Sequence, residues 1–324
     1  MISRRSFLLG TLGAAPAACA APGTARMPNE DVADFPLIDV HSHYAPRAIT
    51  SFGVTPDELL AAMDAAGIRR MVVLGFGPEV PELARTRPAR FVASYIYRNF
   101  RTRQAGGELG DGTAPAEVDR IGAEFEAALA SGLYRGLGEI TTMARPISSR
   151  TTGGSPAPGA SIAPDSPLVR RLIELAGRFD VPINIHCDAA ATRQMVNAVR
   201  AHPKTRVIWA HLGSYLPPGA CADLLRDLPN LSFDLSSKNA GYAGLGGGYE
   251  TYPLHGLRGI DEGWRQLFEG YPERVLFGVD FLAARHLALA REIGEYYRGI
   301  LMRLTPATAR KIGYANAQRL FGLG

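Results

Sequence analysis

The sequence is poor in cysteine and lysine, and it has no long block of like charge. The cysteines are Cys19, Cys187 and Cys221. So few cysteines cannot form a disulfide framework. The formal net charge is only +4 and no run of five or six like charges occurs. These absences argue against an electrostatic surface for nucleic acid or for an anionic membrane.

The bulk composition is that of a folded protein. The chain has 324 residues, of which 46% are hydrophobic and 20% are charged. That hydrophobic fraction supplies a large core, and the charged fraction is too low for a disordered chain. Because the length fits one large domain or two small ones, the order of segments must decide between them.

The first residues predict an export signal. Arg4 and Arg5 precede an apolar stretch from Phe7 to Ala18, and the small residues around Ala20 fit a cleavage site. We therefore expect a twin-arginine signal peptide at 1–20, a flexible linker at 21–35, the twin-arginine export machinery as partner, and a periplasmic or secreted protein. The alternative is a short amphipathic terminus. The apolar stretch is too short for a stable membrane span.

A lipid anchor at Cys19 is the less favoured alternative, because Pro16 stands where a lipobox normally has leucine. The other two cysteines lie inside the chain. Cys187 directly follows His186 on a predicted strand, so strand alternation turns its thiol away from the end where His186 points. We expect a buried and inert thiol there.

From about residue 36 the chain alternates short β-branched runs with longer segments of helical period. Eight strands are predicted at Leu37–Val40, Arg70–Leu74, Phe91–Tyr97, Tyr134–Ile140, Pro182–His186, Arg206–Ala210, Leu231–Leu235 and Val275–Val279. Predicted helices between them include Pro56–Ala66, Glu117–Ala130, Leu168–Arg178, Ala190–Ala201 and Ala288–Met302. This alternation requires parallel pairing. Eight such units predict a single α/β domain, a (β/α)8 barrel over 36–324.

Histidines gather at the ends of the predicted strands. His41 and His43 follow the first strand two positions apart, so their imidazoles share one face. His186 ends the fifth strand, His211 the sixth, and Asp280 follows the eighth. Because a barrel brings all these ends to one mouth, the set predicts a site for a divalent metal. A lone His-x-His pair could be a hydrogen-bonded turn, but the recurrence favours ligation.

The pattern resembles the amidohydrolase superfamily, in particular its amidohydrolase-related branch of metal-dependent barrel hydrolases. The tail Ile312–Phe321 is similar to the closing helix of that branch, and the likeness covers residues 36–322. The resemblance implies that His41, His43 and Asp280 hold one ion. It implies that His186 and His211 hold a second ion, or supply one more ligand and a polarising group. We expect one or two ions, Zn²⁺ in the first place.

The fourth strand decides between those cases in the family, where two-metal members often carry a bridging carboxylated lysine. No lysine lies near 134–142 here. Glu139 follows Gly138 instead, as in the related deoxyribonuclease-like barrels, and its two oxygens could bridge two ions. The alternative role for Glu139 is to accept a hydrogen bond from a ligating imidazole.

These residues predict a metal-dependent hydrolase of a small ester, lactone, amide or related substrate. A bound Zn²⁺ lowers the pKa of water to about 7 and polarises a carbonyl oxygen. Asp280 is the expected general acid and base, and His211 either a ligand or a group facing the oxyanion. Arg98, Lys238 and Tyr242 follow strands and are the predicted substrate-binding residues, with Arg101 and Arg103 as weaker candidates.

Two other functions stay open. The same branch contains metal-dependent decarboxylases with nearly the same ligand set, and one ion with His211 unbound would leave that lyase reaction open. A bridged pair of ions would favour hydrolysis. The second alternative is a periplasmic barrel that holds metal or ligand without catalysis, although the full set of expected ligands argues against it.

Overall fold

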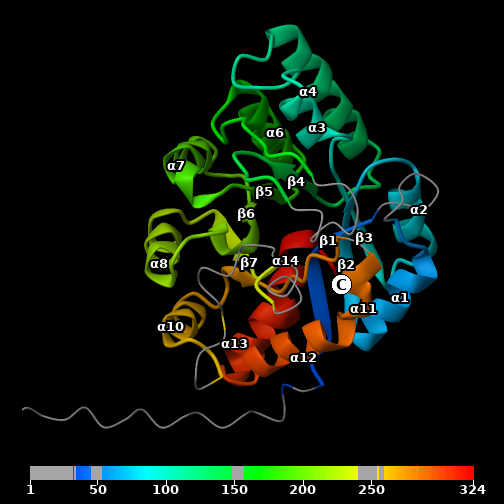
Figure 1. Ribbon diagram of the computed structural model, residues 1–324, viewed down its shortest axis with the longest axis vertical. Helices are drawn as coiled ribbons and strands as arrows, with labels where there is room; N and C mark the ends of the chain where they lie inside the picture. The colour runs from blue at the N-terminus through cyan, green and yellow to red at the C-terminus, as the bar shows by residue number, and fades with distance from the viewer. Residues whose placement is uncertain are drawn as a thin grey trace, which may run out of the picture.

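The computed structural model describes residues 32, 34–44, 53–147, 157–239, 254, 259–282 and 284–324. Within them strands and helices alternate around a central barrel (Figure 1). The predicted export signal at 1–20 lies outside the described residues, as does most of the predicted linker. Among the helices that are described, none is both long enough and apolar enough to cross a membrane.

All eight predicted strands are present and form one parallel sheet in sequence order. Their bounds are β1 Leu37–His43, β2 Ile68–Gly75, β3 Phe91–Tyr95, β4 Leu137–Thr141, β5 Ile183–His186, β6 Val207–Trp209, β7 Leu231–Asp234 and β8 Val275–Leu276. Strand β8 is shorter than predicted and ends at Leu276, although the backbone after it still bonds β1 and turns left-handed only at Asp280 (φ 62°).

The sheet closes between its first and last strands through a seam formed by residues 40–43 and 277–281. Three backbone hydrogen bonds cross it: Val40 N to Phe277 O, Asp280 N to His41 O, and His43 N to Phe281 O, at 3.0, 2.7 and 2.8 Å. The result is a nearly closed barrel of eight parallel strands, as predicted from the order of segments.

Side chains complete this closing seam. The buried Asp39 carboxylate accepts hydrogen bonds from the backbone of His41 (2.9 Å) and Val279 (3.1 Å), and from Ser42 Oγ (2.5 Å). Ser42 Oγ in turn accepts from Phe281 N at 3.0 Å. The register of β1 against β2 shifts between Asp39 and Ser42. Asp39 therefore satisfies backbone donors that the irregular seam leaves without a carbonyl partner.

The helices surround the barrel. They are α1 Pro56–Ala65, α2 Glu79–Thr86, α3 Phe100–Ala105, α4 Pro115–Ala130, α6 Pro167–Arg178, α7 Thr192–Ala201, α8 Pro218–Asp227, α10 Glu262–Gly270, α11 Ala284–Ala288, α12 Ala290–Leu301, α13 Pro306–Arg310 and α14 Asn316–Phe321. Shorter turns are η2 Ala189–Ala191, η3 Ala210–Gly213 and the π-helical η5 Lys311–Ala315. Thr55 caps α1 in a capping box with Glu58, and Ser166 caps α6.

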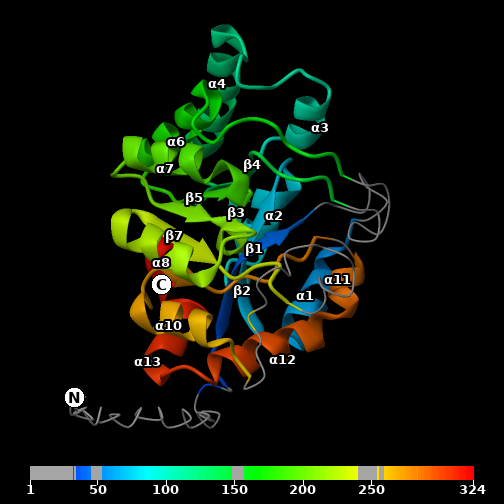
Figure 2. The ribbon, with the colours of Figure 1, turned by 60° about the vertical axis from the view of Figure 1, so that its left-hand side comes forward.

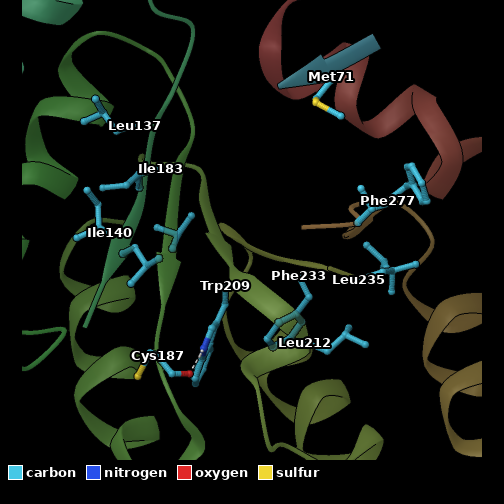
Figure 3. Packing of buried hydrophobic residues seen from close by; sticks show 14 of the residues in the cluster. Met71, Leu137, Ile140, Ile183, Cys187, Trp209, Leu212, Phe233, Leu235 and Phe277 are labelled. Carbon is cyan, nitrogen blue, oxygen red and sulfur yellow. Dashed lines mark hydrogen bonds between the residues drawn. The ribbon is translucent and has the colours of Figure 1, made fainter. Parts of the chain in front are cut away.

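Buried apolar side chains form two clusters. The larger lies between strands and helices and includes Trp209, Phe233 and Phe277 (Figure 3). Trp209 donates its indole N–H to the carbonyl of Cys187 at 2.8 Å. The thiol of Cys187 lies in this cluster, and burial raises its pKa to about 12. The prediction of a buried thiol is confirmed, and its low reactivity stays a prediction.

The smaller cluster fills the barrel interior and joins α14. Val40, Val72 and Leu276 contribute from the strands, and Leu320 and Phe321 from α14. The C-terminal helix α14 therefore packs against β1 and β8 (Figure 1). Asn316 fixes this helix by donating its amide to the carbonyls of Pro272 (2.7 Å) and Val275 (2.8 Å).

Helices α3, α4 and α6 lie together at one end of the molecule in both ribbon views (Figures 1 and 2). Next to them the long connection after β4 folds back on itself, with antiparallel bridges between Ala144 and Ala160 and between Ile147 and Ala157. Gln104 of α3 is buried and holds this hairpin. It donates to Thr141 O (2.8 Å) and accepts from the backbone N–H groups of 161 and 162 (both 3.0 Å).

Candidate metal centre

The predicted ligands converge at the carboxyl ends of the strands. His41 and His43 come from β1, Glu139 from β4, His186 from β5, and His211 and Asp280 from the segments after β6 and β8. They form two groups whose ligand atoms lie within 4.8 Å of one another: His41, His43 and Asp280, and Glu139, His186 and His211. Residues separated by about 240 positions in the chain therefore meet at one site.

The first group brings two imidazoles to one carboxylate. Asp280 Oδ1 lies 3.8 Å from His41 Nε2 and 3.4 Å from His43 Nε2. His41 is fully buried, whereas the side chain of His43 keeps 18% of its surface exposed. Ser237 Oγ donates a hydrogen bond to the other oxygen of Asp280, Oδ2, which fixes the carboxylate in this orientation.

The second group centres on Glu139. Its Oε1 lies 2.9 Å from His186 Nδ1 and 3.0 Å from His211 Nε2. The same oxygen is 3.7 Å from His41 Nε2, and Oε2 is 3.5 Å from His43 Nε2. Glu139 therefore contacts imidazoles of both groups, an arrangement that fits either of its two expected roles, a bridging carboxylate or an acceptor from a ligating imidazole.

Two of the ligands sit on backbone in the left-handed region. His211 has φ 58° and Asp280 φ 62°, conformations that L-residues rarely adopt. Hydrogen bonds hold both: His211 N donates to Asp234 Oδ1 at 3.0 Å, and Asp280 N donates to His41 O at 2.7 Å. Strained backbone that the surroundings hold in place is typical of functional sites.

Asp234 at the end of β7 organises the site from behind the ligands. Its Oδ2 accepts from His41 Nδ1 (3.0 Å) and from Asn184 Nδ2 (2.8 Å). Its Oδ1 accepts hydrogen bonds from His211 N and from both the backbone N–H and the hydroxyl of Ser236. The hydroxyl oxygen of Ser236 also lies 2.7 Å from His211 Nδ1. One carboxylate thus orients a histidine of each ligand group, which turns the Nε2 atoms toward the centre.

The carboxylates create a strongly negative field. Burial alone would lower the pKa of His41, but the charge and hydrogen bond of Asp234, with Glu139 and Asp280, raise it to about 10. The pKa of His186 is raised against burial by Glu139. Burial, together with the charges of the other histidines, lowers the pKa of His211. The same field that favours a proton on His41 favours a cation between the imidazoles.

The donor set fits a divalent metal ion. Nε2 of His41 is fully buried and has no hydrogen-bond partner among the described residues, an arrangement that is costly unless something binds the atom. Imidazole nitrogens and carboxylate oxygens in groups of three are the usual ligands of Zn²⁺ and related ions. The described residues therefore include groups that could hold a metal ion, and ligation by the individual residues stays a prediction.

The three predicted substrate-binding residues differ in how the structure places them. Arg98 is exposed and its guanidinium carbon lies 5.6 Å from the centre of the Phe76 ring. Lys238 is buried, its Nζ donates to Ser214 O at 2.5 Å, and burial lowers its pKa to about 8. Tyr242 lies outside the described residues. The roles assigned to these three residues stay predictions.

Sequence reasoning left several residues of the site unassigned. No role is predicted for Asp234 from the sequence, yet Asp234 bonds His41 directly. Its position at the end of β7, where the other strands carry candidate ligands, is the signal that could have shown this. Asn184 lies two positions before His186 on β5, on the same face of the strand. Only the tertiary structure shows that both meet His41.

The sequence matches the family model described as "Amidohydrolase" over residues 38–323. The chain belongs to the amidohydrolase family. Members of this family are metal-dependent enzymes. Family membership and the candidate ligand groups therefore both indicate an enzyme with a metal site. A comparison with curated proteins found no match to this sequence.

Solved structures resemble this amidohydrolase in fold. An amidohydrolase from Burkholderia multivorans with bound zinc is 16% identical and covers 90% of this chain and 100% of its own, with a TM-score of 0.55. 2,6-Dihydroxybenzoate decarboxylase from Rhizobium is 14% identical and covers 89% of this chain and 99% of its own, with a TM-score of 0.55. A probable 2-pyrone-4,6-dicarboxylic acid hydrolase from Acinetobacter baumannii is 12% identical and covers 89% of this chain and 100% of its own, with a TM-score of 0.53. At these identities the likeness concerns the barrel alone.

Proposed function

We propose that this amidohydrolase is a metal-dependent hydrolase of a small ester, lactone, amide or related substrate. The observation that carries the proposal is the position of Glu139 between two groups of imidazoles. A carboxylate placed there suits a pair of ions, and paired ions favour water attack over loss of carbon dioxide. The structurally similar hydrolase and the similar zinc-bound amidohydrolase support this choice.

In this proposal His41, His43 and Asp280 would hold one ion, His186 and His211 would hold the other, and Glu139 would contribute a carboxylate to the pair. A bound divalent ion, for which Zn²⁺ is the first candidate, lowers the pKa of water and acts as a Lewis acid on the substrate carbonyl. The protein supplies orientation: Asp234 fixes His41, and Ser236 fixes His211. These contacts hold the imidazoles ready before substrate arrives.

Asp280 is the proposed general acid and base. Ser237 fixes its Oδ2, and Oδ1 faces His41 and His43. The nearby histidine charges, acting against burial, hold its pKa below the ordinary value, so Asp280 is ionised at neutral pH and can accept a proton at Oδ1. It can then return that proton to the leaving group. His211 in this scheme serves as ligand; its alternative role is to face the developing oxyanion.

Metal analysis with a substrate screen tests the proposal. We expect bound zinc or a related metal by elemental analysis, and esterase, lactonase or amidase turnover that a chelator removes and added metal restores. His41→Ala and Asp280→Ala should lose turnover while the protein stays folded. His202→Ala is the control, because this half-buried histidine follows α7 and its ring Nδ1 lies 2.8 Å from the carbonyl oxygen of Ala198 in that helix. A fully active His41→Ala protein would refute the mechanism.

Decarboxylation is the second candidate function, supported by the similar fold of the dihydroxybenzoate decarboxylase. One bound ion per chain, together with release of carbon dioxide from an aromatic or unsaturated carboxylate, would favour it. Two ions and turnover of an uncharged ester or lactone would exclude it. Tight metal binding without turnover on broad panels of both substrate types would instead support a barrel that binds without catalysis.

Export through the twin-arginine route is proposed from residues 1–20. The test is cell fractionation of the full chain and of a variant with Arg4 and Arg5 both changed to lysine. The unchanged chain should reach the periplasm or medium, and the variant should stay inside. Equal distribution of both proteins would show that the arginine pair is not an export signal, and labelling of Cys19 with a fatty acid would show a lipid anchor.

A further inference from the structure

The carboxylate of Asp188 lies directly behind His186. Asp188 follows the end of β5 and is buried, with 6% of its surface exposed. Its Oδ1 lies 3.3 Å from His186 Nε2. On the other side of the same ring, His186 Nδ1 lies 2.9 Å from Glu139 Oε1 and 3.2 Å from His211 Nε2. The imidazole of His186 therefore points Nδ1 into the second group of candidate ligands and Nε2 at Asp188.

This orientation is the reverse of the one that His41 adopts. His41 bonds Asp234 through Nδ1 and turns Nε2 toward the centre. In His186 the nitrogen that faces outward is Nε2, and a carboxylate behind it favours a proton on that nitrogen. The neutral ring then keeps a lone pair on Nδ1, the atom that faces Glu139. Asp188 thus selects the form of His186 that can bind an ion from this side.

Hydrogen bonds join the end of β5 to the chain that continues from β4. Thr142 donates its backbone N–H (2.9 Å) and its hydroxyl (2.6 Å) to His186 O. Asp188 N donates to Met143 O at 2.8 Å, and Arg145 N donates to Asp188 Oδ2 at 3.0 Å. The Asp188 carboxylate therefore holds a candidate ligand with one oxygen and the first strand of the hairpin after β4 with the other.

The same segment pairs across the hairpin. The backbone N–H groups of 143, 144 and 147 donate to the carbonyls of 162, 160 and 157, at 3.0, 2.9 and 2.9 Å. The amides of residues 143–147 therefore report on whether the hairpin is paired. Because coupling between two binding events is reciprocal, an ion that needs His186 held by Asp188 must in turn favour the paired hairpin that holds Asp188.

We propose that Asp188 is the positioning residue for the second ion, and that it links occupancy of the second ligand group to pairing of the hairpin after β4. The proposal rests on the proposed function, because it needs a centre that takes two ions. The first ligand group has other partners behind it, Asp234 on His41 and Ser237 on Asp280. Changing Asp188 should therefore affect the second ion and leave the first in place.

Asp188→Asn tests the proposal by zinc titration of the metal-stripped protein against a chromophoric chelator. The amide keeps the shape of the side chain and can still accept from Arg145 N. It then turns an N–H donor toward His186 Nε2, which favours the tautomer protonated on Nδ1. We expect the unchanged protein to bind two ions, and Asp188→Asn to bind the second about 10- to 100-fold more weakly with the first unaltered.

Hydrogen exchange measured by mass spectrometry gives a second readout that does not depend on turnover. In the unchanged protein the second equivalent of zinc should slow exchange of the amides in residues 143–147, and the first equivalent should not. At the same zinc concentration Asp188→Asn should show no such slowing. Exchange that is unaffected by the second equivalent would refute the link between the ion and the hairpin.

Asp111→Asn is the matched control. Asp111 is exposed and its Oδ1 accepts from Ala163 N at 2.6 Å, so this variant loses the same charge and alters a carboxylate that also bonds backbone next to the hairpin. It should keep both ions, and thermal unfolding shows whether each variant is folded.

Equal losses of the second ion in Asp188→Asn and Asp111→Asn would overturn the proposal, and so would an unchanged protein that takes a single ion. The hydrolase function is judged separately by the substrate screen. Two ions with a selective loss in Asp188→Asn, in a protein that hydrolyses no ester, lactone or amide, would support the role of Asp188 and count against the hydrolase function alone.

Discussion

Three of the candidate ligands are each held by a particular polar partner. Asp234 holds His41 through Nδ1, Ser236 holds His211 through Nδ1, and Ser237 holds Asp280. An imidazole whose Nδ1 is engaged in this way presents Nε2 to the centre, so orientation and tautomer are settled together. The partners behind the ligands therefore influence metal affinity as the ligands themselves do.

Asp234→Asn should weaken zinc binding by about 10- to 100-fold, the effect usual for such a partner. The amide keeps the shape of the side chain but removes the charge that acts on His41. Competition with a chromophoric chelator measures the affinity. Asp227→Asn is the control, because this exposed aspartate ends α8 away from the centre. Unchanged affinity in Asp234→Asn would show that the hydrogen bond to His41 only supports the fold.

Zinc binding at pH 7 should release at least one proton. In the metal-free protein the pKa of His41 is raised to about 10, so this imidazole is protonated at neutral pH and must lose the proton before it can bind metal. The apparent affinity should therefore rise about tenfold per pH unit between pH 6 and 8 for each proton released. Calorimetry in buffers of different ionisation enthalpy counts the protons; a count of zero would contradict the charge state assigned to His41.

At the scale of elements, the centre depends on how closely β4 approaches β5. Gly138 has φ +103°, and a Cβ built there would lie 2.1 Å from the carbonyl oxygen of Asn184. No other residue can stand at this position without moving one of the two strands. The glycine thus lets the strand that carries Glu139 lie against the strand that carries His186.

Gly138→Ala should destabilise the protein by about 3 kcal/mol, through overlap with β5 added to backbone strain. Gly132→Ala is the matched control, because Gly132 also has positive φ (+71°) but nothing within 4 Å of the added Cβ. That variant should lose only about 1 kcal/mol. Denaturant unfolding compares them, and equal losses would show that the close approach of the strands has no energetic weight.

At the scale of the whole molecule, the ligands come from five separate strands or the segments that follow them. An ion held by His41, His43 and Asp280 would therefore link the first and last strands across the closing seam. It would lie next to the hydrogen bonds from Asp280 N to His41 O and from Val279 N to Asp39 Oδ1. The ion would bind the folded chain, and the unfolded chain has no equivalent site. Metal occupancy and global stability are coupled for this reason.

Removing the metal should lower the thermal unfolding midpoint by several degrees. A free ion concentration about a thousandfold above Kd stabilises the folded state by about 4 kcal/mol, and a chelator removes that contribution. Thermal scans with and without chelator measure the shift. The His41→Ala protein should show little or none; an equal shift in that variant would place the stabilising ion elsewhere.

The sequence by itself determined the barrel and predicted which candidate ligands meet at its mouth. Eight alternating strands and helices leave few ways to bury their apolar faces, and His41, His43, His186 and His211 stand where strands end, so local pattern was sufficient. Strand ends were less well predicted. Left-handed backbone at His211 and Asp280 depends on hydrogen bonds to distant residues, which no local pattern contains.

Only the tertiary structure decided what surrounds those ligands. Asp234 and Asn184 meet His41 from strands 193 and 143 positions away, and Arg145 reaches Tyr215 because a hairpin folds over from another loop. Hydrogen bonds and charges act over a few ångströms in space, whereas the sequence records only order along the chain. Periodicity reveals which face a residue occupies, but the partner on the facing element is fixed by packing.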